Sequence, residues 1–266
     1  MLRNNPSKAI VLVALCFSAS TVMAETAEEK GLRIAKAAKA RDQGWQNSQA
    51  DMAMILRNAE GQESQRALRI KTLEIANDGD KSLTIFDHPA DVKGTAFLSY
   101  SHPVEADEQW LYLPALKRVK RIASRNKSGP FMGSEFAYED LASFEVEKYN
   151  YRYLRDENCP GQPLECHVAE YYPNDPNSGY TRQIVWLDKT EYRPWKIEFY
   201  DRKDALLKTL THHDYQQYLN HYWRPDRMRM ENHQTGKSTE LTWENYRFQS
   251  DLTEDDFNQN SLKRAR

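Results

Sequence analysis

Two cysteines, Cys159 and Cys166, have the spacing in this chain that most directly suggests covalent chemistry. They flank the segment PGQPLE, which is typical of a hairpin tip. The spacing does not fit the Cys-x-x-Cys pattern of redox pairs, and two thiols alone make a poor metal site. In an oxidising compartment we expect the pair to form a disulfide.

The histidines His212, His213 and His221, together with Asp214, are the residues that could suggest a metal site. Adjacent residues on a strand point to opposite faces, so His212 and His213 cannot both line one site. We therefore expect solvent-facing strand histidines and no metal.

Three further patterns resemble catalytic motifs but lack their context. Ser124 and Lys127 match S-x-x-K, without the companion motifs of acylating enzymes and in a turn. The segment 236–238 ends like a phosphate-binding loop, yet Glu231 stands where the first glycine belongs. Glu139 and Asp140 suit the first turn of a helix better than acid–base catalysis. The sequence therefore predicts no enzymatic activity and no cofactor.

An apolar loop is the strongest functional candidate, and it belongs to an unusually varied stretch, residues 109–144. Aromatic and apolar side chains occur in a strand before the loop and in the loop itself, where Gly129 and Gly133 give the backbone freedom. The candidate residues for a lipid cavity or its lid are Trp110, Tyr112, Phe131, Met132, Phe136 and Tyr138. The alternative is a plug that completes a solid core.

A basic run lies between that strand and that loop. It consists of Lys117, Arg118, Lys120 and Arg121. We interpret it either as an ordinary solvated strand face or as a contact for an anionic partner, such as lipid head groups, a membrane surface or an acidic protein patch.

The same stretch carries a family resemblance. QWLYLPALKRVKRI followed by FMGSEFAYEDL resembles the periplasmic outer membrane lipoprotein-sorting proteins, whose fold is similar to that of the carriers LolA and LolB. The resemblance covers roughly residues 45–248. It implies a half-open antiparallel barrel with an apolar cavity, carriage of lipid or acylated protein without chemistry, and a link with RND-type (MmpL-like) inner-membrane exporters.

The first 24 residues have the features of a cleaved secretory signal, which predicts a periplasmic protein. Arg3 and Lys8 precede the short apolar run AIVLVALCF, and the small residue Ala24 precedes Glu25. Lipid attachment at Cys16 is disfavoured because the large Leu15 precedes it. Without this segment the net charge is −4, which argues against bulk nucleic-acid binding.

The elements that must position these residues are mainly strands. Residues 25–43 have the apolar stripe and charge distribution of a helix. After Gly44 the apolar period changes to two, and turn residues separate some ten to thirteen segments. We predict a mainly β fold, a curled antiparallel half-open barrel with an N-terminal helix and a short helix or loop as lid. Residues 25–250 would form one domain and residues 251–266 a charged, frayed tail.

The sequence favours a carrier that binds a lipid or the acyl chains of a lipoprotein for transfer between envelope membranes. The alternative is an accessory subunit that docks on an RND-type exporter without carrying lipid. A periplasmic hydrolase is the third and weakest interpretation.

Overall fold

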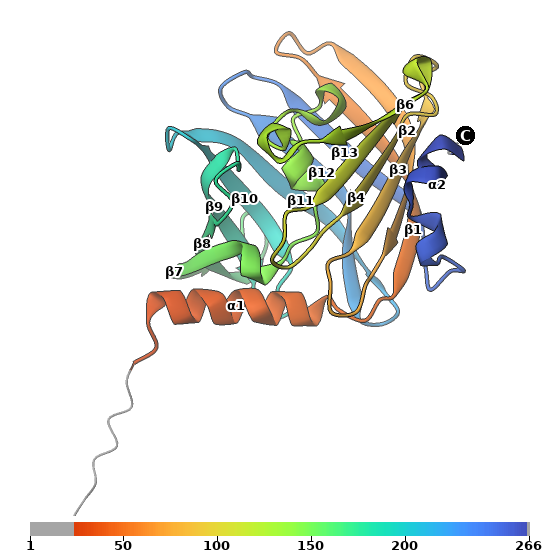
Figure 1. The fold of residues 1–266 in the computed structure, drawn as a ribbon. Coiled ribbons are helices and arrows are strands. Elements are labelled where there is room, and N and C mark those ends of the chain that lie inside the picture. Colours follow the sequence, from red (N-terminus) through yellow and green to blue (C-terminus); the bar gives the residue numbers. More distant parts are fainter. Residues whose placement is uncertain (1–23, 265–266) are drawn as a thin grey trace, which may run out of the picture.

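A single antiparallel sheet of thirteen strands dominates the computed structural model, which describes residues 24–264 (Figure 1). The predicted signal segment lies outside the described residues, except for Ala24. The strands are β1 (Asn47–Arg57), β2 (Glu63–Leu73), β3 (Lys81–His88), β4 (Ala96–Tyr100), β5 (Glu108–Leu113), β6 (Arg118–Ile122), β7 (Tyr149–Asn158), β8 (Glu165–Pro173), β9 (Tyr180–Asp188), β10 (Pro194–Asp201), β11 (Leu206–Tyr218), β12 (Tyr222–Asn232) and β13 (Ser238–Phe248).

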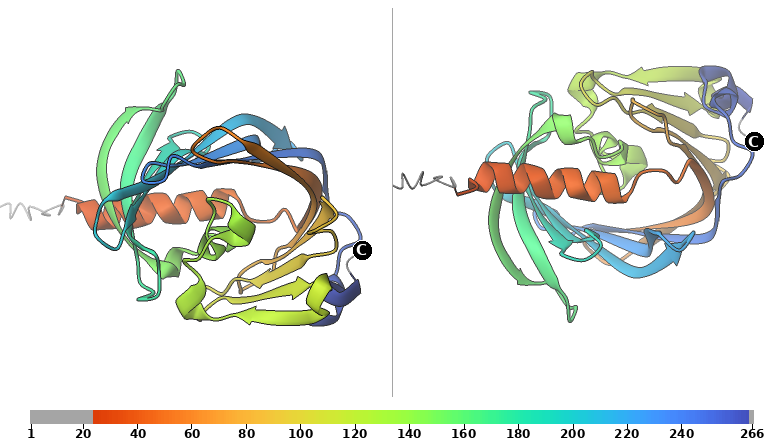
Figure 2. Two further views of the ribbon diagram at one scale, coloured as in Figure 1. Left: turned by 90° about the horizontal axis from the view of Figure 1, so that it is seen from above. Right: turned by 90° about the horizontal axis from the view of Figure 1, so that it is seen from below.

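The sheet consists of two meanders joined where β1 pairs with β13. One meander runs from β1 to β6 and the other from β7 to β13, so β6 and β7 are the two edges. Figure 2 shows that the sheet curls and that these edges face each other without closing. A sheet of this many twisted strands curls because each strand is rotated against its neighbour. The predicted half-open barrel is confirmed.

The period-two pattern places alternate side chains inside and outside the curl. In β1, Met52 and Met54 are buried, whereas Asp51 and Ala53 are exposed. The inward residues join a cluster that includes Phe86, Phe97 and Met230. Alternation of this kind is typical of antiparallel sheets with one face on the core.

Helix α1 (Ala27–Arg41) lies across one open end of the curl (Figure 2). A capping box begins it: Glu29 N–H donates to Thr26 Oγ1 over 3.1 Å, and Glu29 accepts from Thr26 N–H. Gly31 packs against β7 so closely that an added Cβ would lie 2.9 Å from Tyr153 N. The predicted N-terminal helix is confirmed.

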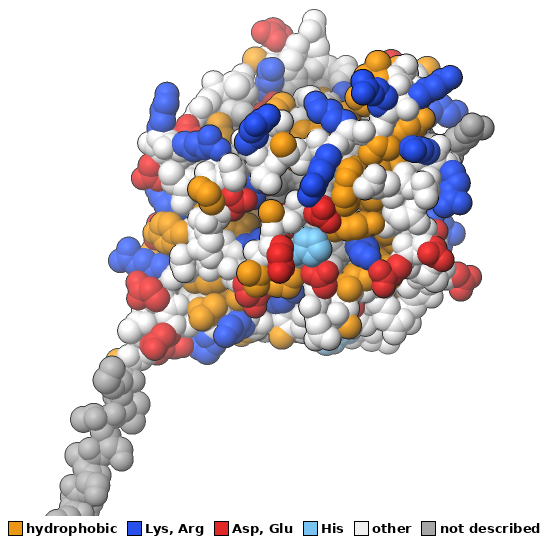
Figure 3. Space-filling view, viewed as in Figure 1, with side chains coloured by type: hydrophobic (Ala, Val, Ile, Leu, Met, Phe, Trp, Pro, Cys, Tyr) orange, Lys and Arg blue, Asp and Glu red, His pale blue; other side chains and the backbone are white. Residues whose placement is uncertain are grey.

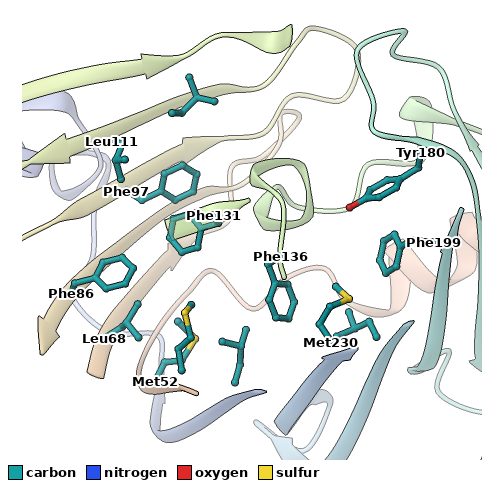
Figure 4. Close-up of a cluster of buried hydrophobic side chains, with 14 residues drawn as sticks. Met52, Leu68, Phe86, Phe97, Leu111, Phe131, Phe136, Tyr180, Phe199 and Met230 are labelled. Atoms are coloured by element: carbon teal, nitrogen blue, oxygen red, sulfur yellow. The ribbon is translucent and has the colours of Figure 1, made fainter. Parts of the chain in front are cut away.

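The connection between the two edge strands, residues 123–148, fills part of the interior. It contains the 3-10 turns η2 (Ser124–Asn126), η3 (Phe131–Gly133), η4 (Tyr138–Leu141) and η5 (Val146–Lys148). Phe131 and Phe136 are 1% and 3% exposed, and Figure 4 shows them among side chains from both halves of the sheet. We call residues 129–141 the plug.

Buried side chains of the second meander help to fix the plug. Lys208 of β11 donates to Asp140 Oδ2 over 2.6 Å and to the Glu135 carbonyl over 2.9 Å. Tyr180 of β9 donates its hydroxyl to Asp140 Oδ1 over 2.7 Å. Because the side chains of Lys208 and Asp140 are 4% and 5% exposed, loss of either partner would leave an uncompensated buried charge.

The C-terminal segment is ordered against the convex face, so the prediction of a frayed tail is wrong for residues 252–264. This segment forms η6 (Glu254–Asp256) and α2 (Gln259–Arg264). Phe257 and Leu262 are buried against Leu83, Leu98 and Trp110. Phe257 and Leu262 provide this contact, although most residues around them in the segment are charged or polar.

Cys159 and Cys166 are joined by a disulfide at the β7–β8 hairpin, which confirms the predicted pairing. Both are buried together with Val168, Trp186 and Trp195. In the described part of the chain, no helix is both long and apolar enough to cross a membrane.

Candidate functional site

The sheet encloses a cavity of about 1220 Å³ at the end that α1 crosses. Its walls come from the C-terminal half of α1, residues 42–48, the end of β2, residues 143–147, and strands β8 to β12. Ligand pockets in proteins generally measure about 300–1,000 Å³, so this cavity is large for its kind.

One wall of the cavity is apolar and belongs mainly to the second meander. Tyr171, Val185 and Leu187 are buried there, and Ile197 and Met228 are partly buried beside them. These side chains point into the curl because they occupy the inward positions of β8, β9, β10 and β12. The wall can accept hydrocarbon because burying apolar surface is favourable without any specific hydrogen bond.

Three arginines occur in the cavity lining, and each has a carboxylate partner. Arg41 pairs with Glu191, Arg224 Nη1 lies 2.6 Å from Asp42, and Arg193 Nε donates to Asp188 Oδ2 over 2.7 Å. The fully buried Asp188 also accepts hydrogen bonds from Thr190 and from the Glu191 and Arg193 amides.

Burial alone would raise the pKa of Asp188. The Glu191 N–H and the Arg193 guanidinium outweigh that effect, so the pKa lies below its usual range.

A second polar group lies on the α1 side of the cavity. Lys39 donates to Glu145 Oε1 over 3.1 Å and to the Phe144 carbonyl over 3.0 Å. Asp80 lines the same region, and burial raises the pKa of both Asp80 and Glu145, against the attraction of Lys39. The cavity is thus amphipathic, with hydrocarbon-like and charged parts.

His212 lies inside the cavity wall, so the prediction of solvent-facing histidines is wrong for this residue. It is 5% exposed, while His213 on the opposite face is partly exposed and bonds to Thr211. Burial lowers the pKa of His212 to about 3, which keeps the ring neutral. The alternation of β11 was readable from the sequence, but which of its faces turns inward was not.

The structure separates the six residues predicted for a lipid cavity or lid, and none of them lines the cavity. Trp110 and Tyr112 point to the convex face and pack in the cluster that covers Phe257. Phe131, Met132, Phe136 and Tyr138 belong to or pack on the interior cluster of the plug. The nearby residues 143–147 do line the cavity.

The basic run lies at the β6 edge of the sheet. Lys117, Arg118, Lys120 and Arg121 are all exposed. Arg121 donates to Glu108 Oε1 over 2.8 Å. Lys and Arg side chains gather in the upper part of Figure 3, where β6 lies, and acidic ones lie mostly nearer to α1. The run and the cavity are therefore at different places on the molecule.

The residues that resemble catalytic motifs make structural contacts in the fold. Ser124 and Lys127 belong to the η2 turn, and Lys127 pairs with Asp175 over 2.7 Å. Glu139 accepts hydrogen bonds from Ser178 and the Gly179 amide, and Asp140 anchors the plug. Across residues 24–264, no group of three or more His, Cys, Asp or Glu side chains could hold a metal ion.

Comparison with solved structures places the fold in the LolA-like class of half-barrels. A LolA superfamily protein from Nitrosomonas europaea matches with a TM-score of 0.68 at 22% identity, over 90% of this chain and 100% of the other. A DUF1329 family protein from Desulfovibrio piger matches with a TM-score of 0.84 at 28% identity, over 89% and 99% of the two chains.

A more similar structure defines the family. It bears the name of an outer membrane lipoprotein-sorting protein domain from Vibrio parahaemolyticus, with 64% identity, a TM-score of 0.86, and coverage of 89% of this chain and 99% of the other. A family model described as "uncharacterized protein" matches residues 78–264. No curated protein matches the chain. The chain belongs to the LolA-like outer membrane lipoprotein-sorting protein family.

Proposed function

We propose that this protein is a periplasmic, non-enzymatic carrier that holds a lipid, or the acyl chains of a lipoprotein, for transfer between envelope membranes. The observation that carries the proposal is the amphipathic cavity of about 1220 Å³ inside the curled sheet. The lipoprotein-sorting name of the Vibrio parahaemolyticus relative supports it.

The magnitudes are adequate for carriage. Burial of hydrocarbon contributes about 0.8 kcal/mol per methylene, so a sixteen-carbon chain would contribute about 12 kcal/mol before the cost of ordering it. Such a chain needs contact with an apolar wall, which Val185, Leu187 and Ile197 offer. No reacting group is required.

The proposal assigns the plug a different role from the lid that the sequence suggested. Phe131 and Phe136 complete the core at one end of the curl, and the ligand occupies the other end. Helix α1 and residues 143–147, which line the cavity, are the segments that a ligand would meet.

Native mass spectrometry of the mature protein, residues 25–266, with lipid extraction tests the proposal. We expect a mass adduct that extraction identifies as an acyl lipid. If the protein carries no adduct, takes up no fluorescent acyl probe and captures an RND-type exporter, the carrier proposal fails and the docking subunit is supported. Hydrolysis of an ester substrate by the protein would instead support the interpretation as a periplasmic hydrolase.

A further inference from the structure

The inner wall of the cavity has hydrogen-bonding capacity that the protein itself does not use. Trp223 Nε1 and His212 Nδ1 are both buried and have no hydrogen-bond partner within residues 24–264, and both residues line the cavity. An indole N–H is a donor only, so an acceptor must come from elsewhere. Buried polar groups in native proteins are generally paired, and an unpaired one needs an explanation.

Arg193 packs against Trp223 and against Tyr215, and Tyr215 neighbours His212. Its guanidinium carbon is 4.4 Å from the centroid of the Trp223 ring and 5.4 Å from that of Tyr215. The Tyr215 ring in turn lies 6.4 Å from His212, nearly parallel to it. The guanidinium is thus packed among aromatic rings, which is a favourable setting for it.

Asp188 fixes the guanidinium through one edge only. Arg193 Nε donates to Asp188, but no hydrogen bond of Nη1 or Nη2 occurs among residues 24–264. Its side chain is 14% exposed and belongs to the cavity lining, so these donors are accessible to a ligand there. Arg41 and Arg224 differ in that each already uses a terminal Nη group: Arg41 Nη2 bonds to Glu191, and Arg224 Nη1 bonds to Asp42 and to the Trp223 carbonyl.

We propose that Arg193 and Trp223 bind the anionic oxygen group, carboxylate or phosphate, of an amphiphile whose hydrocarbon lies along the apolar wall. Two Nη groups and one indole N–H supply donors, and none of them supplies an acceptor. Charge-assisted hydrogen bonds from a planar guanidinium match the geometry of both oxyanions. His212 Nδ1 remains available to accept a hydrogen bond from a hydroxyl group of the ligand.

This inference rests on the proposed function and names its ligand class. The test titrates the mature protein with a dansyl-labelled undecanoic acid and with the methyl ester of the same probe. The tails are identical, so the ratio of the two affinities isolates the charged oxygen group. We expect the acid to bind at least tenfold more tightly than the ester.

In Arg193→Met we expect the affinities for the acid and the ester to agree within about twofold, with the affinity for the ester unchanged from wild type. Because that variant leaves Asp188 without its cation, a second variant, Trp223→Phe, keeps an aromatic ring beside the guanidinium and removes the indole N–H. It should reduce the preference two- to fivefold. The control Arg227→Met removes an arginine of β12 that pairs with Asp214 outside the cavity lining, and should keep the wild-type ratio.

The outcomes separate the two claims. Equal binding of acid and ester, or an unchanged ratio in both cavity variants, would overturn the oxyanion site while leaving the carrier intact. No uptake of either probe would overturn both. Dodecyl phosphate and inorganic phosphate complete the test: displacement of the probe by the former alone supports a lipid head group, whereas equal displacement by inorganic phosphate contradicts an amphiphile site.

Discussion

At the scale of single residues, the cavity is characterised by polar groups that are fixed but incompletely paired. Asp188 accepts several hydrogen bonds and holds Arg193, while the Arg193 Nη groups have no partner in the described chain. His212 is neutral because it is buried, and its Nδ1 has no hydrogen-bond partner in the part of the chain that the structure describes. Fixed side chains with spare hydrogen-bonding capacity are characteristic of binding sites, where orientation is prepared in advance of the ligand.

Neutral His212 makes stability depend on pH. Its folded-state pKa of about 3 lies below the ordinary 6.5, so the unfolded chain binds more protons between these values. Its contribution is therefore full above about pH 6.5 and is lost as the pH falls toward 3. Between pH 7 and pH 5 we expect wild type to lose about 2 kcal/mol more unfolding free energy than His212→Gln.

Urea unfolding of the unliganded protein at both pH values measures this difference. The comparison with a variant is needed because Asp80 and Glu145, whose pKa values are raised by burial, act in the opposite direction. His213→Gln, on the outer face of the same strand, should behave like wild type much more closely. Identical pH slopes for wild type and His212→Gln would show that the ring is not buried and neutral.

At the scale of elements, the plug and α1 divide the interior. The plug fills one end with Phe131 and Phe136 and is anchored through Asp140 and Lys208, and α1 crosses the other end over the cavity. Figure 1 shows the connection 123–148 above α1 within the curl. A substitution in the plug should therefore act on folding, and one at the α1 end on binding.

Phe131→Ala tests this division. We expect it to lower the unfolding free energy by about 3–5 kcal/mol, because the ring is fully buried against Phe86 and Phe97. The affinity for a fluorescent acyl probe should stay within about twofold. Phe144→Ala, at a half-buried ring of the cavity lining, should weaken the affinity for the probe more than it lowers the unfolding free energy. A larger loss of probe affinity in Phe131→Ala would return the lid role to the plug.

The strands and α1 were predictable from the sequence because their signals are local. Alternation in residues 51–54 and the charge distribution of residues 27–41 each follow from neighbours a few positions apart. The direction of Trp110 and Tyr112 was not predictable, because β5 is apolar on both faces and the C-terminal segment covers its convex side. Phe257 and Leu262 lie too far along the chain for a local pattern to reveal that contact.

At the scale of the whole molecule, the cavity arises from pairing between distant strands. The contact of β1 with β13 joins the two meanders, and the resulting curl brings residue 39 of α1 and residue 212 of β11 into one lining. No spacing in the sequence encodes this juxtaposition. That is why the family resemblance implied an apolar cavity, whereas neither the charged part of the cavity nor the residues that line it could be predicted.

The basic run at the β6 edge also acts at this scale. We propose that it contacts an anionic membrane surface, and because Arg121 pairs with Glu108, the three residues without that pairing matter most. Neutralising Lys117, Arg118 and Lys120 with glutamine should weaken sedimentation with phosphatidylglycerol vesicles at least tenfold at low salt, since each such charge contributes about 1 kcal/mol near the surface.

The difference should vanish near 1 M salt, where screening is strong. A control with the same change at the exposed Lys36, Lys203 and Lys237 keeps the net charge equal and should bind like wild type. Equal weakening in both triple variants would reduce the effect to net charge and remove the specific role of this edge.

Native mass spectrometry of two tryptophan variants of α1 tests the central claim most directly, namely that the cavity holds hydrocarbon. Ala38 is half-buried and lines the cavity, whereas Ala40 is exposed on the same helix. We predict that wild type and Ala40→Trp retain an acyl-lipid adduct and that Ala38→Trp loses it while melting within a few degrees of wild type. An adduct that persists unchanged in Ala38→Trp, or is absent from wild type, would contradict the account.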